Sequence, residues 1–222
     1  MLAAVLAAIP FLSGVTAVEH LTLPSGPAPL VSVVTTAGSI RVESGGAGVE
    51  VVATKKASTA TALAALKVVV VRGAGRIAIR ASYANGCAGH CDGGISFDVR
   101  VPAGASLDLA TQTGNIAATG LSGDARLSTT VGTLDARYSS VTGVRRIEMR
   151  EEIGRVTLAL PSSAQLGRVR ASTMVGRVNS DWPLEPANAL VVGSTADRAF
   201  TPGGVDVRLQ STVGAVYLLK RP

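Results

Sequence analysis

The fold is decided by a stretch that reads Thr130-Val131-Gly132-Thr133-Leu134-Asp135-Ala136-Arg137-Tyr138. Its glycine can adopt the positive φ that a sharp change of chain direction requires. After the glycine, apolar and charged residues alternate as they do in a half-buried β-strand. We therefore predict a turn followed by a strand whose inward residues are Leu134, Ala136 and Tyr138.

The same pattern recurs along the chain. Its other copies are Thr36-Ala37-Gly38-Ser39-Ile40-Arg41-Val42, Thr113-Gly114-Asn115-Ile116, Ile153-Gly154-Arg155-Val156-Thr157-Leu158, Met174-Val175-Gly176-Arg177-Val178 and Thr212-Val213-Gly214-Ala215-Val216-Tyr217-Leu218. The steps from Gly114 to Gly132, Gly154 and Gly176 are 18, 22 and 22 residues. This period of 18–22 residues is typical of a solenoid, in which each unit has one buried face and its neighbours complete the core. The next step, 38 residues to Gly214, is close to two units, with the intervening one degenerate around residues 188–192.

The rest of the chain is also rich in strand patterns. Residues 95–101 alternate between apolar and polar and end at Pro102-Ala103-Gly104, which indicates a strand followed by a turn. Residues 58–67 lack Gly and Pro and favour one short helix that begins at a Ser58 cap. The β-branched run Val68-Val69-Val70-Val71 then predicts a buried strand.

Size and composition fit one all-β domain. The chain has 222 residues, enough for a sizeable core, yet only 3% are aromatic. Val, Leu, Ile and Ala must therefore fill the interior, which a narrow stacked structure tolerates better than a wide sandwich. The 25 glycines and 10 prolines indicate many turns.

The N-terminus has the features of an export signal. Residues 2–18 carry no charge and end in the small-residue pattern Val15-Thr16-Ala17, so we expect cleavage after Ala17. An uncleaved anchor is the alternative. The expected organisation is a signal peptide over residues 1–17 and a single β-repeat domain over residues 18–222. That organisation implies a periplasmic or extracellular protein.

Two cysteines, Cys87 and Cys91, lie in a loop-like segment. An oxidising compartment favours a disulfide between them, which would staple this loop rather than hold the fold. A metal site that also uses His90 and Asp92, or a pair of reduced thiols, remains an alternative.

One segment resembles a known family. The run Val99-Arg100-Val101-Pro102-Ala103-Gly104-Ala105-Ser106-Leu107-Asp108-Leu109-Ala110-Thr111-Gln112-Thr113-Gly114-Asn115-Ile116, with the glycine units after it, is similar to the bacterial DUF4097 β-strand-repeat proteins, also called "putative adhesins". The resemblance covers roughly residues 30–219. It implies a right-handed parallel β-solenoid or a related β-roll on an exported protein, with no established catalytic residues to carry over.

The sequence offers little material for catalysis. It has two His, and it contains neither a nucleophile elbow nor a phosphate-binding loop. The best enzyme hypothesis is an analogy with β-helix polysaccharide enzymes, which would use outward charged residues on adjacent coils: Asp108, Asp124, Asp135, Arg126 and Arg137. We predict no enzyme and no cofactor, and interpret the protein as a cell-envelope structural or interaction module of unknown partner.

The basic residues suggest a second interpretation. The net charge is +6 and the isoelectric point about 9.9. Arginines fall in consecutive repeats, and if they align on one face they would attract anionic polymers such as lipopolysaccharide, acidic polysaccharide or extracellular DNA. No recognised nucleic-acid module is present. The candidate polyanion contacts are Arg145, Arg146, Arg168 and Arg170, and the alternative is a solvated face whose charges protect the sheet.

Overall fold

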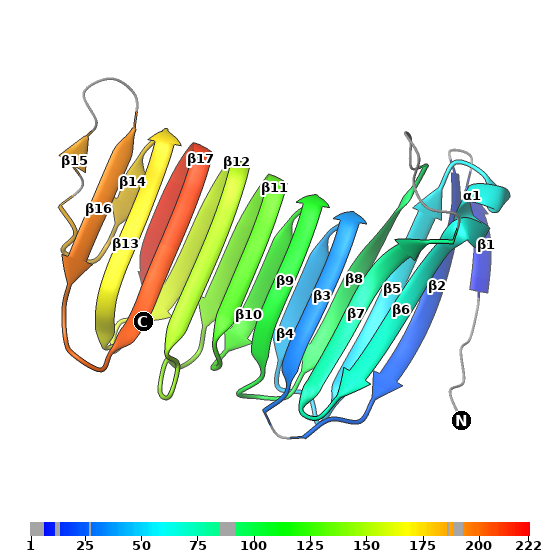
Figure 1. Ribbon diagram of the computed structural model, residues 1–222, viewed down its shortest axis with the longest axis horizontal. Coiled ribbons are helices and arrows are strands. Elements are labelled where there is room, and N and C mark those ends of the chain that lie inside the picture. The colour runs from blue at the N-terminus through cyan, green and yellow to red at the C-terminus, as the bar shows by residue number, and fades with distance from the viewer. Residues whose placement is uncertain (1–6, 12–13, 27, 85–91, 186, 189–192) are drawn as a thin grey trace.

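The computed structural model describes residues 7–11, 14–26, 28–84, 92–185, 187–188 and 193–222 (Figure 1). Within them the chain forms seventeen strands and one six-residue helix, which confirms the all-β prediction. The strands are β1 (Ala7–Phe11), β2 (Gly14–Leu23), β3 (Leu30–Ala37), β4 (Ile40–Ser44), β5 (Val49–Ala57), β6 (Leu66–Gly73), β7 (Arg76–Tyr83), β8 (Gly94–Val101), β9 (Ser106–Thr113), β10 (Ile116–Leu121), β11 (Ala125–Tyr138), β12 (Arg146–Pro161), β13 (Leu166–Val175), β14 (Val178–Ser180), β15 (Ala187–Asn188), β16 (Ser194–Ala199) and β17 (Val205–Arg221). The helix is α1 (Ala60–Ala65), capped by the hydroxyl of Thr59 rather than by Ser58. In the part of the chain that the structure describes, no helix could span a bilayer.

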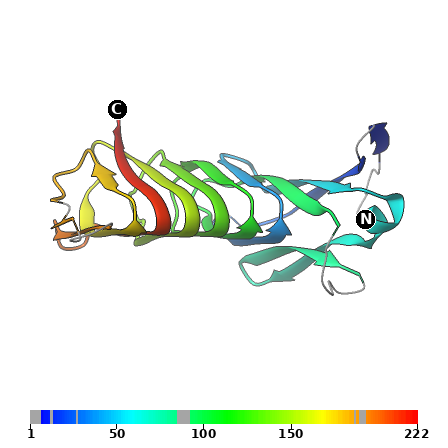
Figure 2. The same cartoon turned by 90° about the horizontal axis from the view of Figure 1, so that it is seen from above.

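All strands belong to one sheet, which curls into two arms that face each other across the core (Figure 2). The long strands β11, β12 and β17 run along the first arm, bend, and return along the second. β11, for example, pairs with β9 before its bend and with β10 after it. In spatial order the first arm is β6, β7, β3, β9, β11, β12, β17, β13, β16 and β15. The second arm is β1, β2, β5, β8, β4, β10, β11, β12, β17 and β14.

The middle of each arm is parallel and in register, whereas the ends are antiparallel. Parallel pairing extends from β7 to β13 in the first arm and from β8 to β14 in the second. The pairs β6–β7, β13–β16 and β2–β5 are antiparallel. Equivalent residues of spatially neighbouring units therefore lie side by side.

The order of the units in space differs from their order in the chain. β17 carries Gly214 and lies between β12 and β13, so its unit separates the units of Gly154 and Gly176. The 38-residue interval does not hold a regular extra unit. Its described residues form the short β14 and β15 and the antiparallel β16, which end the first arm. Residues 189–192 of the expected degenerate unit lie outside the described residues.

Each bend is built around a glycine at which two backbones nearly touch. The corner glycines, in spatial order, are Gly38, Gly114, Gly132, Gly154, Gly214 and Gly176, with φ between 138° and 156°. A Cβ on each of the last five would lie inside van der Waals contact with the carbonyl oxygen of the glycine before it in this order. Only glycine satisfies both the positive φ and the close approach.

The predicted alternation places the core correctly. Leu134, Ala136 and Tyr138 are buried, as are Val156 and Leu158 of the next unit. The core residues of β8, namely Ile95, Phe97, Val99 and Val101, are buried as well.

Two sequence expectations about burial were wrong. The alternation of Val156 and Leu158 with Thr157 predicts an outward Ala159, but Ala159 is 6% exposed. The run from Val68 to Val71 forms a strand, but Val69 and Val71 are 42% and 59% exposed. Their side chains point to the outward face of the sheet, whereas Val68 and Val70, on the other face, are half-buried.

Replacing Gly154 by Ala tests the corner geometry. The variant must accept an unfavourable φ and also displace the Gly132 carbonyl, so we expect a loss of roughly 2–4 kcal/mol in the free energy of unfolding, measured by urea titration. Gly143→Ala is the matched control: its φ is 79°, but nothing lies within 4 Å of the added Cβ, and it should cost only about 1 kcal/mol. Equal losses in the two variants would show that the close approach contributes nothing.

Candidate functional site

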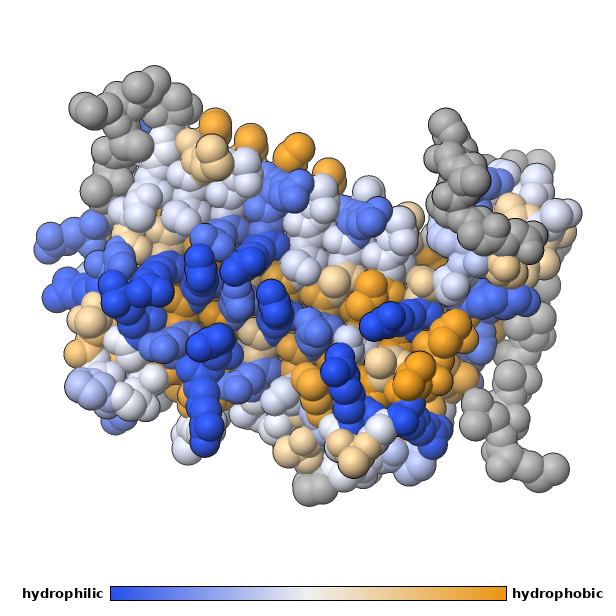
Figure 3. Space-filling model, viewed as in Figure 1, coloured by the Kyte–Doolittle hydropathy of each residue, from blue (hydrophilic) through white to orange (hydrophobic). Residues whose placement is uncertain are grey.

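The outward side of the first arm gathers arginines from four neighbouring strands, visible as the hydrophilic area over β12, β17 and β13 in Figure 3. The register places Arg126 of β11 beside Glu148, Glu148 beside Arg208, and Arg208 beside Arg170. We call this surface the arginine face. It comprises Arg126, Arg146, Arg168, Arg170 and Arg208.

Within the arginine face lies a pocket of about 370 Å³. Four arginines and two acids line it: Arg146, Arg168, Arg170, Arg208, Glu148 and Asp206. The lining is therefore polar with an excess of positive charge. Guanidinium groups on a shared surface can bind carboxylate, sulfate or phosphate oxygens in a bidentate manner.

Asp197 of β16 fixes two of these arginines. Its carboxylate accepts two hydrogen bonds from Arg168, at 2.8 and 2.7 Å, and lies 3.4 Å from Arg170. The hydrogen bond from Arg168 lowers the pKa of Asp197, so this carboxylate stays charged to lower pH. Among the described residues, Arg146 and Arg208 take part in no ion pair. They are the pocket cations most available to a ligand.

The structure brings together three of the four predicted polyanion contacts. Arg146, Arg168 and Arg170 line the same pocket, whereas Arg145 lies in the turn before β12 and lines a different depression beside Gln165. Arg208 was not among the predicted contacts, because nothing in the order of the chain shows that β17 inserts between β12 and β13. The alternation Asp206-Val207-Arg208-Leu209 was the available signal.

The outward acids considered for catalysis do not converge. Asp108 pairs in register with Arg126 on the first arm, while Asp135 binds Arg137 at 2.9 Å on the second. Asp124 accepts hydrogen bonds from the backbone N–H groups of Arg145 and Arg146, at the start of β12, at 2.7 and 3.1 Å. Within the described ranges, no group of three His, Cys, Asp or Glu side chains could hold a metal ion.

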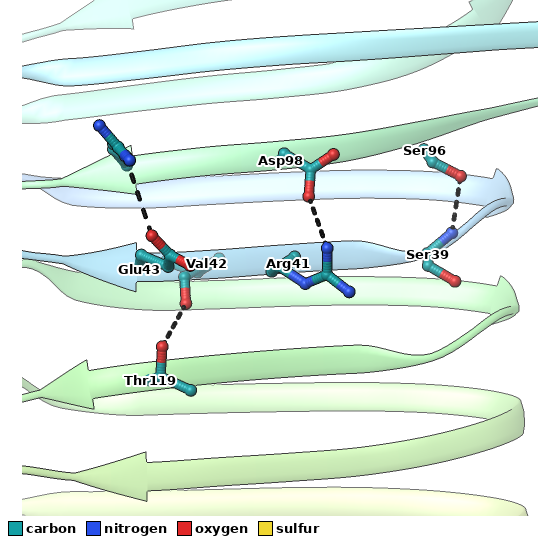
Figure 4. A network of polar contacts seen from close by, with 8 residues as sticks. Ser39, Arg41, Val42, Glu43, Ser96, Asp98 and Thr119 are labelled. Atoms are coloured by element: carbon teal, nitrogen blue, oxygen red, sulfur yellow. Dashed lines mark hydrogen bonds and ion pairs between the residues drawn. The ribbon is translucent and has the colours of Figure 1, made fainter.

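Charges on β4 and β8, in the second arm, are matched in pairs. Figure 4 shows Arg41 of β4 pointing toward Asp98 of β8, at 3.4 Å, and Glu43 of the same strand reaching the neighbouring arginine. That neighbour is Arg100, 3.8 Å from Glu43. The β4 and β8 part of the second arm therefore offers an anionic polymer little unpaired positive charge.

The cysteine segment cannot be compared with its prediction. Cys87, His90 and Cys91 lie outside the described residues, so their pairing stays a prediction. Asp92, which was considered as a metal ligand, accepts a hydrogen bond from the backbone N–H of Ser58 at 3.2 Å.

A row of buried polar side chains runs across the inner side of the corners. In register it comprises Thr35, Thr111, Thr129, Glu151, Ser211 and Thr173. The hydroxyls of Thr111, Thr129 and Thr173 each donate to the carbonyl oxygen of the neighbouring corner glycine, at 3.0, 3.1 and 3.0 Å. These bonds satisfy the carbonyl groups that the close glycine contacts leave facing inward.

Glu151 interrupts this row. It is 3% exposed, and neither its carboxylate oxygens nor the Ser211 hydroxyl has a hydrogen-bond partner of normal geometry among the described residues. Burial raises the pKa of Glu151; the Ser211 hydroxyl opposes this effect and the charge of Glu152 adds to it.

Comparison with solved structures identifies the fold. One structure, of a "putative cell adhesion protein" from Clostridium sporogenes, has a TM-score of 0.62 at 13% identity, with 92% of this chain and 99% of that chain covered. Another, of a "putative adhesin" from Bacteroides fragilis, has a TM-score of 0.33 at 8% identity over 91% of this chain and 97% of that chain. No family model matches the sequence, and neither does any curated protein. The first similarity shows that the curled all-β fold occurs in a solved protein.

Replacing Glu151 by Gln tests the buried acid. The pKa of Glu151 is raised in the folded state, so the folded protein binds a proton more tightly than the unfolded chain does. The free energy of unfolding therefore falls as the pH rises above about 4.3, the pKa of glutamate in the unfolded chain. We expect Glu151→Gln to gain about 1 kcal/mol at neutral pH and to differ less from the parent near pH 4, in urea titrations at both pH values. The control is Glu50→Gln, an equal change of charge at an exposed acid on β5, away from Glu151. A destabilising Glu151→Gln at neutral pH would show that the charged form is the favoured one.

Proposed function

We propose that the protein is a non-catalytic, adhesin-like binding module and that its arginine face binds anionic polymers. The observation that carries the proposal is the pocket that three neighbouring strands line with Arg146, Arg168, Arg170 and Arg208. The fold similarity to a protein described as a "putative cell adhesion protein" is consistent with this role. The outward acids considered for catalysis, Asp108, Asp124 and Asp135, do not converge, which is why the enzyme alternative is not preferred.

The shape of the site suits an extended ligand. Neighbouring strands lie about 4.8 Å apart, so residues in register present charges at regular intervals along the arm. A single exposed arginine contributes roughly 1 kcal/mol or less to an ionic contact, because water and salt screen it. Several contacts to one chain must therefore act together, and a polymer of carboxylates, sulfates or phosphates can supply them.

We also propose a fold family for the protein. The in-register parallel strands and the repeated corner glycines support assignment to a parallel β-solenoid or β-roll of the DUF4097 type. An adhesin-like role also implies a location outside the cytoplasm.

Export with cleavage after Ala17 is part of the proposal. Ala17 lies within β2, where it pairs with Lys55 of β5, and the residues from Val18 to Leu23 would keep their own pairing with β5 after cleavage. The expected mature protein begins at Val18, as intact-mass measurement of protein from the cell envelope would show. Recovery of full-length protein from the cytoplasm would contradict export.

Charge reversal tests the arginine face. We expect Arg146→Glu combined with Arg208→Glu to weaken binding to dextran sulfate and polygalacturonate at least about tenfold, since two unpaired cations become repulsive. Binding of the parent protein should also fall steeply with added salt. The control, Arg155→Glu with Arg177→Glu, changes the net charge equally but alters exposed positions outside the pocket.

Each result decides between the interpretations. Binding that is insensitive to salt and to the Arg146 and Arg208 changes would overturn the proposal. An equal effect of the control pair would show that total charge alone matters. Depolymerisation of either polymer by the purified protein would overturn the non-catalytic assignment.

A further inference from the structure

A second surface lies at the other end of the first arm, where β6 and β7 form a hairpin (Figures 1 and 2). We call residues 66–83 the edge hairpin. Among the described residues, β6 pairs with β7 alone, so its other side is a free sheet edge. The other terminal strands are shorter than the eight residues of β6: β14 has three, β15 two, and β1 five including Pro10. β6 contains no proline.

The pairing shows which backbone groups are free. Ala84 donates its N–H to the Ala65 carbonyl at 2.8 Å, which identifies this pair as a hydrogen-bonded one. In an antiparallel ladder such pairs alternate, so Lys67, Val69 and Val71 direct their backbone groups to β7. The N–H and C=O groups of Val68, Val70 and Arg72 therefore point toward the free edge, where another strand could accept and donate hydrogen bonds.

The outward side of the edge hairpin is apolar and cationic. Val69 and Val71 are 42% and 59% exposed, and all residues from 71 to 76 are exposed. The sequence contains no acidic residue from Val51 to Cys91. The hairpin carries Lys67, Arg72, Arg76 and Arg80, and none of them forms an ion pair among the described residues.

We propose that the free edge of β6 binds an extended acidic polypeptide segment as an additional strand. The backbone groups of the edge would supply the hydrogen bonds, Val69 and Val71 the apolar contacts, and the four cations the attraction for acidic side chains. This surface is separated from the arginine face by β3 and β9, and it needs no anionic polymer.

The same observations disfavour two other occupants. A lipid bilayer would leave the N–H and C=O groups of the β6 edge without partners, which costs several kcal/mol per group in hydrocarbon. A second copy paired through β6 would bring together eight cations with no acid on either hairpin. An acidic strand satisfies the backbone groups and the charges at once.

The test uses the full chain and a labelled synthetic peptide in which glutamate alternates with valine. We expect saturable binding by fluorescence anisotropy. A peptide with lysine in place of glutamate should not bind. A peptide N-methylated on alternate residues keeps its charges but cannot add as a strand, so it should bind at least about tenfold more weakly.

Protein variants test the surface itself. Lys67→Glu with Arg80→Glu should weaken peptide binding at least about tenfold, whereas Arg155→Glu with Arg177→Glu, an equal charge change elsewhere, should not. Val70→Pro removes an edge N–H and should also weaken binding. Val70→Pro is not informative if it lowers the melting temperature of the protein. In that case the N-methylated peptide tests whether binding needs backbone hydrogen bonds, because it leaves the protein unchanged.

Four outcomes would overturn the proposal. They are equal binding of the acidic and N-methylated peptides, binding unaffected by the Lys67 and Arg80 changes, binding to anionic phosphatidylglycerol vesicles instead of the peptide, and association of the protein with itself through β6. The arginine-face variant Arg146→Glu with Arg208→Glu should bind the peptide as the parent does. Failure of the polymer-binding proposal is therefore distinguishable from failure of this one.

Discussion

The architecture depends on the contact between each corner glycine and the carbonyl oxygen of the corner glycine before it in spatial order. Gly114 donates its N–H to the Val131 carbonyl at 3.0 Å, while the Thr129 hydroxyl donates to the Gly114 carbonyl. These bonds hold two backbones so close that no side chain fits between them. Because every unit bends at the same position, each long strand can pair with neighbours in both arms. The arms then enclose a core narrow enough to be filled by aliphatic side chains, with Phe97 and Tyr138 as its largest buried aromatics.

The same constraint organises the surface. Corner glycines in register force the residues on either side of them into register, so outward residues of different units form straight rows across the sheet. Arg170 and Arg208 become neighbours although 38 residues separate them in the chain. A charged row of this kind is a by-product of stacking. It becomes a binding surface only where acids do not neutralise it, as Asp98 and Glu43 do on the second arm.

The sequence predicts which side of a strand is buried better than it predicts which strands are neighbours. Alternation from Leu134 to Tyr138 and from Ile95 to Val101 identified the core, because the period of two reports the environment of each strand directly. The insertion of β17 was not predictable, since units with the same corner glycine can stack in any order without changing the local pattern. Arg145 was predicted with the other contacts from its place in the arginine series, but it lies in the turn before β12 and lines a different depression. Arg208 was missed for the opposite reason: its neighbours on the arginine face belong to strands far away in sequence. The sequence also did not predict that Glu151 lies in the row of buried threonines and serine at the corners. Only the strand register shows that it occupies a position where neighbouring units have threonine or serine.

The two ends of the first arm differ in how much of the sheet edge is left unpaired. At the β16 end the chain turns back on itself, and the last strand there, β15, has two residues. At the other end, β6 remains long, regular and unpaired among the described residues, with a run of four valines that would favour pairing with any exposed strand. Lys67 and Arg72 lie near the ends of that run, and no acid in the hairpin balances them. Charges of one sign repel an identical edge but attract one of opposite sign. Lys67 and Arg72 therefore disfavour pairing between two copies of β6. For the same reason, a strand that pairs with β6 must be acidic.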